Sequence, residues 1–375
     1  MTSGTAILLT GIICAVACAL PGTFLILRRM AMMTDAISHA ILPGLVFGYW
    51  LAGSSNLIVG ALGATAAAIL TVTVVEALQR TRRIESAEAM GIVFPAMFAL
   101  GTILISRYFA QVHLDTDAIL YGNIEFSAFD RLIVGGRDLG PQSLWIMSVL
   151  LIINVAVLTL LYKELKISTF DPALAQSLGF SPVLVHYLLM LLLSITTVGA
   201  FTAVGAILVV ALVIVPAATA YLLTERLLHM MIASVMIGAL GAIGGYWLAL
   251  WIDGSIAGGI VTMLGILFML ALLFSPGQGL VAQRHRAWRN RERFAIDMLV
   301  MHLATHERTE EEYSESSLGH IGAALHWDPE QAIRTIRRAG ARGMVVRANG
   351  NVVLTEQGRH YVERLRHMRR LTVER

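Results

Sequence analysis

Residues 33–44 read Met-Thr-Asp-Ala-Ile-Ser-His-Ala-Ile-Leu-Pro-Gly and place an ionisable pair inside an apolar stretch. Asp35 and His39 are four residues apart, so on a helix they share one face. A carboxylate in hydrocarbon is costly unless it is neutralised, and such residues usually line a pathway or pair inside a helix bundle. The meaning of this stretch therefore depends on whether the chain around it spans a membrane.

The composition is that of a membrane protein with a soluble tail. Of the 375 residues, 57% are hydrophobic and 14% are charged, whereas about 25% of the residues in a soluble domain are charged. Before Leu280 there are 11 Lys and Arg against 13 Asp and Glu, and from Leu280 onward 17 against 12. We expect a transmembrane domain over 1–279, a basic linker over 280–292 and a separate domain over 293–375.

Apolar runs divide the first 279 residues into nine expected membrane-spanning helices, since about 20 residues cross the hydrocarbon core. The expected fold is an all-α polytopic membrane protein followed by a small domain. Eight spans are the alternative, if 183–223 forms one span and a re-entrant piece. The nine spans are 4–27, 33–53, 56–78, 87–107, 142–162, 183–202, 205–223, 230–251 and 256–275.

Basic residues in the connections orient these spans. Eight Lys and Arg fall in the connections on one side, whereas the opposite loops mix Arg with Asp and Glu. Lys and Arg concentrate in cytoplasmic loops, so we expect the amino terminus outside and the basic tail in the cytoplasm. This predicts a multi-pass protein of the cytoplasmic (inner) membrane.

One connection on the basic side, Phe170–Pro182, predicts a short amphipathic helix. Asp171 can cap this helix, Pro172 suits its first turn and Gly179 can end it. A short helix in a cytoplasmic loop can dock on another protein or lie at the membrane interface. The pattern alone does not separate these two uses.

The donor atoms of Asp35 and His39 suit a metal ion. A carboxylate oxygen and an imidazole nitrogen together fit a borderline divalent cation such as manganese, iron or zinc. One copy supplies only two ligands, and a homodimer that brings two copies to its axis would supply four. The alternative is an Asp–His ion pair that holds helices together.

Four segments resemble those of the metal-type ABC permeases, the family that imports manganese, zinc or iron. The segment Arg28–Gly44 resembles the family signature, and three others agree with the family in order and spacing. The similarity extends from about residue 5 to residue 279. The three further segments are Glu88–Phe94 with Ala99–Gly101, Leu120–Ile124 and Gly205–Ala220.

This resemblance implies a permease with alternating access, built from two copies or from this chain and a paralogue. It implies that Asp35 and His39 contribute the transmembrane metal site, and that Phe170–Pro182 is the coupling helix, which sits in a cleft of the nucleotide-binding subunit. The residues around His39 look closer to manganese and iron members, so manganese (or iron) is the expected cargo and zinc the alternative. The expected coupling residues are Asp171, Pro172, Ala175, Leu178 and Gly179.

The chain lacks the phosphate-binding pattern G-x-x-x-x-G-K-[ST], and its only lysines are Lys163 and Lys166. We therefore expect a transport subunit that is not itself an enzyme and holds no permanent cofactor. ATP hydrolysis and metal capture are expected from partners. These are a cytoplasmic ATP-binding subunit and an extracytoplasmic metal-binding receptor protein.

The tail predicts a small α+β domain. Helical patterns over 294–306, 317–326 and 328–340 precede two β-branched runs around Asn349-Gly350, a strong hairpin signal, and a last helix follows from Glu356. Three helices, a hairpin and a helix make a winged helix-turn-helix. The arrangement resembles the DNA-binding domain of metal-dependent repressors of the diphtheria-toxin-repressor type, without their dimerisation domain and most of their metal ligands.

Arginines on the third tail helix and in the wing form a basic face of the kind that phosphate contacts need. DNA contact stays open beside a regulatory or structural use, such as sensing metal or touching the ATPase. A membrane-tethered metal-responsive transcriptional regulator is therefore a rival of a different class, and a secondary transporter is a third. The candidate contacts are Arg334, Arg337, Arg338 and Arg347.

Overall fold

A computed structural model describes residues 2–52, 57–81, 83–108, 124–125, 127, 129–134, 137–309, 312–348 and 350–373. The chain forms two compact units, Met1–Leu280 and Val281–Arg375. Each unit has its own hydrophobic core. Of the segments that resemble metal-type permeases, residues 120–123 lie outside the described residues.

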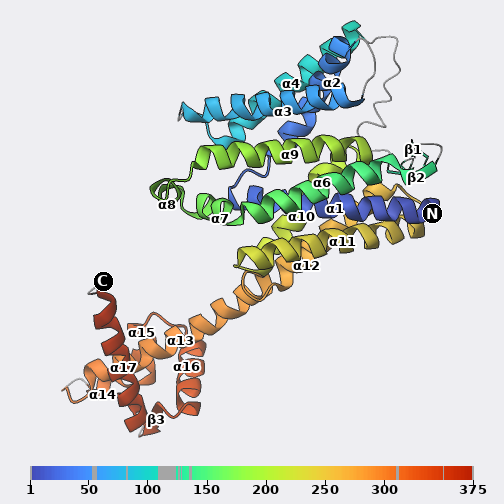
Figure 1. Ribbon diagram of the computed structural model, residues 1–375. Coiled ribbons are helices and arrows are strands. Elements are labelled where there is room, and N and C mark those ends of the chain that lie inside the picture. The colour runs from blue at the N-terminus through green and yellow to red at the C-terminus, as the bar shows by residue number, and fades with distance from the viewer. Residues whose placement is uncertain are drawn as a thin grey trace. The chain divides into compact units, whose positions relative to one another are not determined.

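The described part of the first unit is a bundle of long helices with two short helices and one small hairpin (Figure 1). The short helices are α7 (Tyr162–Phe170) and α8 (Pro172–Ser177), and strands β1 (Arg131–Val134) and β2 (Arg137–Pro141) form the hairpin. The long helices are α1 (Ser3–Leu27), α2 (Met33–Ala52), α3 (Leu57–Arg80), α4 (Ser86–Tyr108), α6 (Gln142–Leu160), α9 (Pro182–Val204), α10 (Ala206–Leu223), α11 (Leu227–Ile252) and α12 (Ile256–Phe274).

The chain is a mostly helical polytopic membrane protein. Within the described residues, eight helices are long and apolar enough to cross a membrane. Helix α2 is not among them, and Asp35 and His39 interrupt its apolar run near its start. Gly205 separates α9 from α10, and each of these two helices is long and apolar enough to be a candidate span.

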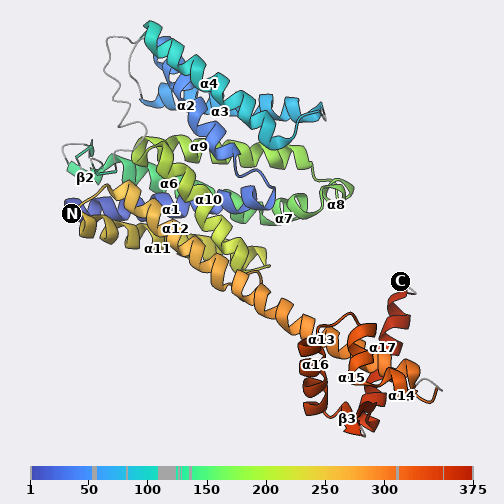
Figure 2. The ribbon, with the colours of Figure 1, turned by 180° about the vertical axis from the view of Figure 1, so that it is seen from behind.

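Helix α1 is the centre of one helix group, in which it packs against α6, α9, α10 and α11 (Figures 1 and 2). A polar contact links three of these helices. The Asn154 amide on α6 donates to the carbonyl oxygen of Ala17 on α1 at 2.9 Å, and the Thr196 hydroxyl on α9 lies 3.1 Å from Asn154 Oδ1. Hydrocarbon offers no competing partner for these buried groups, so the contact stabilises the packing of the three helices.

Helices α2, α3 and α4 form a second group, and α9 packs against α2 and α3 of this group as well as against α1. Glycines let α2 and α3 approach closely. A Cβ added to Gly44 would lie 2.6 Å from the Cα of Ala64, and one added to Gly48 would lie 2.6 Å from the carbonyl oxygen of Val59. Small residues at such an interface allow backbone contact, so these two glycines fix how close α2 lies to α3.

The second unit has a core built on one face of helix α13 (Leu280–His306). Its buried residues Ile296, Leu299, Val300 and Leu303 follow helical spacing and pack with residues from the rest of the unit. Residues 280–292, expected as a linker, form the first half of this helix. The elements that follow are α14 (Glu312–Glu315), α15 (Leu318–Ala324), α16 (Pro329–Ala341), β3 (Val345–Ala348), β4 (Asn351–Leu354) and α17 (Glu356–Val373).

The expected tail hairpin is confirmed by strands β3 and β4, which pair antiparallel with Ala348 opposite Asn351. Asn349 lies outside the described residues, and Gly350 has a φ of +85°. The described residues 312–316 of the acidic segment before α15 are also structured. Helix α14 forms there, and the Ser316 carbonyl accepts a hydrogen bond from the Val352 N–H at 2.9 Å, so this segment is attached to β4.

Candidate functional site

Asp35 and His39 lie in the first two turns of α2 and face one another. His39 Nε2 lies 3.6 Å from Asp35 Oδ1, and the two side chains are 22% and 39% exposed. That separation is within ion-pair range but longer than a hydrogen bond. Two donors bound to one cation at about 2.1 Å lie at most about 4.2 Å apart, so this geometry allows both atoms to bind the same ion.

Helix α4 supplies an aromatic wall beside the imidazole. The rings of Phe94 and Phe98 meet the His39 ring edge to face, with centroids 4.3 and 5.4 Å away. These contacts restrict the rotation of the ring. The neighbouring Ser38 hydroxyl donates to the Thr34 carbonyl at 2.9 Å, so that proton is engaged by the helix backbone.

A second polar group, not expected from the sequence, surrounds Arg28 at the end of α1. The guanidinium donates to Thr169 Oγ1 at 3.1 Å, Ser168 Oγ at 3.0 Å and His186 Nδ1 at 3.2 Å. Because a guanidinium only donates, His186 accepts through Nδ1 and carries its proton on Nε2. That Nε2 lies against a carboxylate oxygen of Glu76, to which its N–H can donate. The group therefore connects α1, α3, α7 and α9.

The residue that could have indicated this polar group in the sequence is Glu76. It is a carboxylate inside the expected span 56–78, where an ionisable residue indicates a partner within the bundle. Its partners in the structure are His186 and Tyr187, whose hydroxyl donates to Glu76 Oε2 at 2.8 Å. A cavity of about 780 Å³ lies beside these residues and is also lined by Pro172 and Pro182, the first residues of α8 and α9.

Helix α8 begins as the sequence predicted. Asp171 Oδ1 accepts a hydrogen bond from the Leu174 N–H at 2.9 Å, and Pro172 occupies the first turn. Gly179 follows the helix with a φ of +87°, a conformation that favours glycine. Ala175 is fully buried, whereas Leu178 is 55% exposed. The segment is thus anchored on one side and presents an apolar side chain on the other.

The four arginines expected to contact phosphate do not form one surface. Arg337 and Arg347 both line a hollow between α16 and β3, and Arg334 is exposed. Arg338 instead forms an ion pair with Glu292 and lies over the Trp288 ring, 5.4 Å from its centroid, so it faces α13. Of the four, Arg337 and Arg347 therefore lie together, and Arg338 is turned toward α13.

Comparison with known proteins shows that the first unit matches one protein family. The profile of the ABC 3 transport family matches residues 4–275. Among solved structures, PsaBC from Streptococcus pneumoniae in complex with Fab matches with a TM-score of 0.62 and 30% identity. That match covers 74% of this chain and 94% of the PsaBC chain.

Two curated relatives differ in how much of the chain they match. The zinc transport system membrane protein TroD of Treponema pallidum (strain Nichols) is 46% identical over 352 residues, 94% of this chain and 96% of TroD. The manganese transport system membrane protein MntD of Bacillus subtilis (strain 168) is 45% identical over 280 residues, 75% of this chain and 95% of MntD. TroD therefore matches into the second unit, whereas MntD has a length that suits the first unit alone.

Proposed function

We propose that this chain, which belongs to the ABC 3 transport family, forms the membrane pathway of an ATP-driven importer. The proposed cargo is manganese or iron. The chain is the permease subunit of a metal ABC importer. The observation that carries the choice of pathway is the Asp35–His39 pair in α2, two donors 3.6 Å apart on one helix face.

In this proposal Asp35 and His39 are the first ligands of the transported ion. A carboxylate and an imidazole suit Mn²⁺ and Fe²⁺, and neither needs a thiolate. Because one chain supplies two donors here, two copies or this chain and a paralogue would supply four at a shared axis. Phe94 and Phe98 would hold the imidazole in place while the ion passes.

Zinc is the second candidate cargo, because the TroD relative, 46% identical over nearly the whole chain, is named for zinc. The same two ligands also suit Zn²⁺, so the geometry does not separate the two metals. Competition between the two metals during uptake distinguishes the two cargoes. Excess zinc would suppress manganese uptake strongly if zinc is the cargo, and weakly if manganese is.

The test is uptake of radioactive manganese by cells that express this chain with its ATPase and receptor. Asp35→Ala and His39→Ala should each reduce uptake by about tenfold or more at matched membrane levels. Asp130→Ala and His229→Ala are matched controls, because both residues are exposed and lie outside α2. Undiminished uptake in both α2 variants would show that the pair is structural.

We also propose that α8 docks on the cytoplasmic ATP-binding subunit, while an extracytoplasmic receptor delivers the metal. The capped, buried attachment of α8 and the exposed Leu178 support this assignment. Leu178→Asp should reduce both co-purification of the ATPase and metal uptake. Leu139→Asp, in the β1–β2 hairpin, changes a leucine that is 44% exposed and should do neither.

For the second unit we propose a winged helix-turn-helix fold in the cytoplasm. The order α13, α15, α16, β3, β4, α17 and the two-residue connection between the strands support it. Contact with DNA would use Arg334, Arg337 and Arg347. Salt-sensitive binding of the purified full chain to DNA from its own promoter, lost in Arg337→Ala, would support this use, and absence of such binding would remove it.

A further inference from the structure

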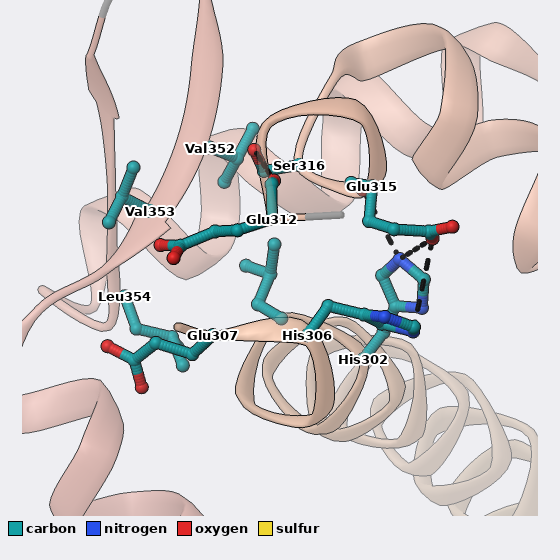
Figure 3. A pocket seen from close by; sticks show the side chains of 10 residues that line it. His302, His306, Glu307, Glu312, Glu315, Ser316, Val352, Val353 and Leu354 are labelled. Carbon is teal, nitrogen blue, oxygen red and sulfur yellow. Dashed lines mark hydrogen bonds and ion pairs between the residues drawn. The ribbon is translucent and has the colours of Figure 1, made fainter. Parts of the chain in front are cut away.

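We propose that the second unit holds a metal site of its own, formed by His302, His306 and Glu315 with His320 beside it. Figure 3 shows the Glu315 carboxylate facing the imidazoles of His302 and His306. The site would take a divalent transition cation. It uses no residue of the membrane unit and does not rest on the transport proposal.

Three separate elements bring these side chains together. His302 and His306 lie four residues apart at the end of α13, so both imidazoles project from one helix face. Glu315 is the last residue of α14, which returns toward that face, and His320 lies in α15. The four residues span only 19 positions, but the turn through α14 is needed to bring the carboxylate back to the imidazoles.

The distances suit a shared ion. The ligand atoms of His302, His306 and Glu315 all lie within 4.8 Å of one another. The Nε2 atoms of His302 and His306 lie 3.5 and 3.9 Å from Glu315 Oε2. Donors bound at about 2.1 Å in a tetrahedral shell are about 3.4 Å apart, so small side-chain rotations complete the geometry.

The Glu315 carboxylate belongs to this cluster rather than to a wider acidic surface. Two other glutamates line the same pocket, but each has another partner. Glu307 Oε1 accepts from Arg359 Nε at 2.7 Å, and Glu312 Oε2 accepts from the Arg308 N–H at 2.7 Å. Of these three carboxylates, only Glu315 has imidazoles around it.

His320 is expected to orient the Glu315 carboxylate and not to bind the metal itself. Its Nε2 lies 2.7 Å from Glu315 Oε2, a hydrogen-bond distance, and its side chain is 42% exposed. A group that holds a ligating carboxylate in this way orients the ligand and tunes its affinity. His302 and Glu315 are only 10% and 17% exposed, so the metal would bind at the more enclosed end of the cluster.

The set of two imidazoles and one carboxylate with room for water is typical of zinc and of iron(II) sites. The alternative is a cluster in which the imidazoles pair with the Glu315 carboxylate directly and no metal is bound. The metal site and the ion-pair cluster differ in whether they bind a metal ion. A metal site binds one ion per chain at neutral pH, whereas an ion-pair cluster binds none.

The test is a Co²⁺ titration of the purified full chain carrying Asp35→Ala and His39→Ala, which removes the pair in the membrane unit. Protein purified through a tag without histidine should bind one Co²⁺ per chain and develop the visible absorption of imidazole-ligated cobalt. Zn²⁺ should displace it. Absence of both stoichiometric binding and the absorption bands would overturn the proposal.

Variants in the same background locate the ion. His302→Ala and Glu315→Gln should each weaken Co²⁺ binding by more than about tenfold, and His320→Ala should weaken it less. His360→Ala and Glu363→Gln are matched controls, because they change an exposed histidine–glutamate pair of the same unit. Thermal melting without metal shows whether each variant is folded. Binding unchanged in folded His302→Ala and Glu315→Gln would overturn the proposal.

Discussion

Arg28 shows how one side chain can hold several helices at the edge of a membrane bundle. Its planar guanidinium reaches two hydroxyls of α7 and the imidazole of His186 at the same time. The rigid fork of an arginine allows this, whereas the single ammonium of a lysine does not. Arg28 therefore links the end of α1 to α7 and α9 directly and to α3 through His186 and Glu76.

Arg28→Lys should destabilise the membrane unit by about 2 kcal/mol even though the charge is kept, because half-buried acceptors lose their donors. Arg28→Ala should cost at least as much. Lys166→Ala removes an exposed charge from α7 and should change stability little. Thermal unfolding in detergent measures the differences, and equal melting temperatures for Arg28→Lys and the wild type would contradict the argument.

Tyr361 forms the corresponding polar contact in the second unit. Its hydroxyl donates to Asp297 Oδ1 at 2.7 Å and joins α17 to α13. Burial, and then the hydrogen bond to Asp297 and the charge of that carboxylate, raise the pKa of Tyr361 above its ordinary value of 10.0. The folded state thus favours the protonated phenol.

Tyr361→Phe should lower the stability of the second unit by about 1–2 kcal/mol at neutral pH. Since the folded pKa is raised, the contribution of the tyrosine is complete below pH 10.0 and is lost as the pH rises through the raised pKa. Hydrogen exchange of α13 and α17 in the full chain measures this at several pH values. A difference between the two proteins that grows above pH 10 would contradict the assigned sign.

At the scale of single residues, the sequence predicted what depends on local spacing. The positions of Asp35 and His39 on one helix face, and the cap that Asp171 provides, each involve residues within four positions of one another. Arg28 and His186 are 158 positions apart, so only the packing of α1 against α9 brings them together. Spacing along the chain carries no information about such a pair.

At the scale of elements, the junction between α9 and α10 depends on one backbone conformation. Gly205 has φ of +82° and ψ of 168°, a region that is almost exclusive to glycine. It ends one apolar helix and starts the next with no intervening loop. Two candidate spans can therefore follow directly from one another.

Gly205→Ala should destabilise the membrane unit by about 1–3 kcal/mol, because the added Cβ is strained in this conformation. Gly265→Ala is a matched control within α12, where an added Cβ would meet nothing within 4 Å. That change should be neutral or slightly stabilising, since alanine favours a helix more than glycine does. Detergent-state melting of both variants tests the contrast, and a neutral Gly205→Ala would contradict it.

Eight of the long helices could be predicted because each is a continuous apolar run of a length that membranes require, whereas Asp35 and His39 interrupt the run of α2. The tail hairpin could be predicted because its turn residues have a specific backbone preference. The first half of α13 could not, since residues 280–292 are basic and mostly exposed and have no apolar periodicity to mark a helix. Helix α14 was missed for a similar reason, as it is four residues long in an acidic stretch.

At the scale of the whole molecule, the two units have separate cores, and the relatives differ in whether they match the second unit. In the described part of the chain, the core of the first unit contains no residue beyond Leu280, and the core of the second contains none before it. The family profile ends at residue 275, and MntD has a length that suits the first unit alone. The second unit thus adds something to a transport body that has its own core.

A chain that ends at Leu280 should therefore still fold in the membrane and import metal at a rate within about twofold of the full chain, since a unit with its own core can fold alone. It should also lose the Co²⁺ binding proposed for His302, His306 and Glu315. Uptake and melting temperature are measured at matched membrane levels, with Asp35→Ala in the truncated chain as the inactive control. If the truncated chain melts like the full one but imports nothing, the second unit takes part in transport itself, and its role would have to be sought in the coupling of transport to ATP hydrolysis.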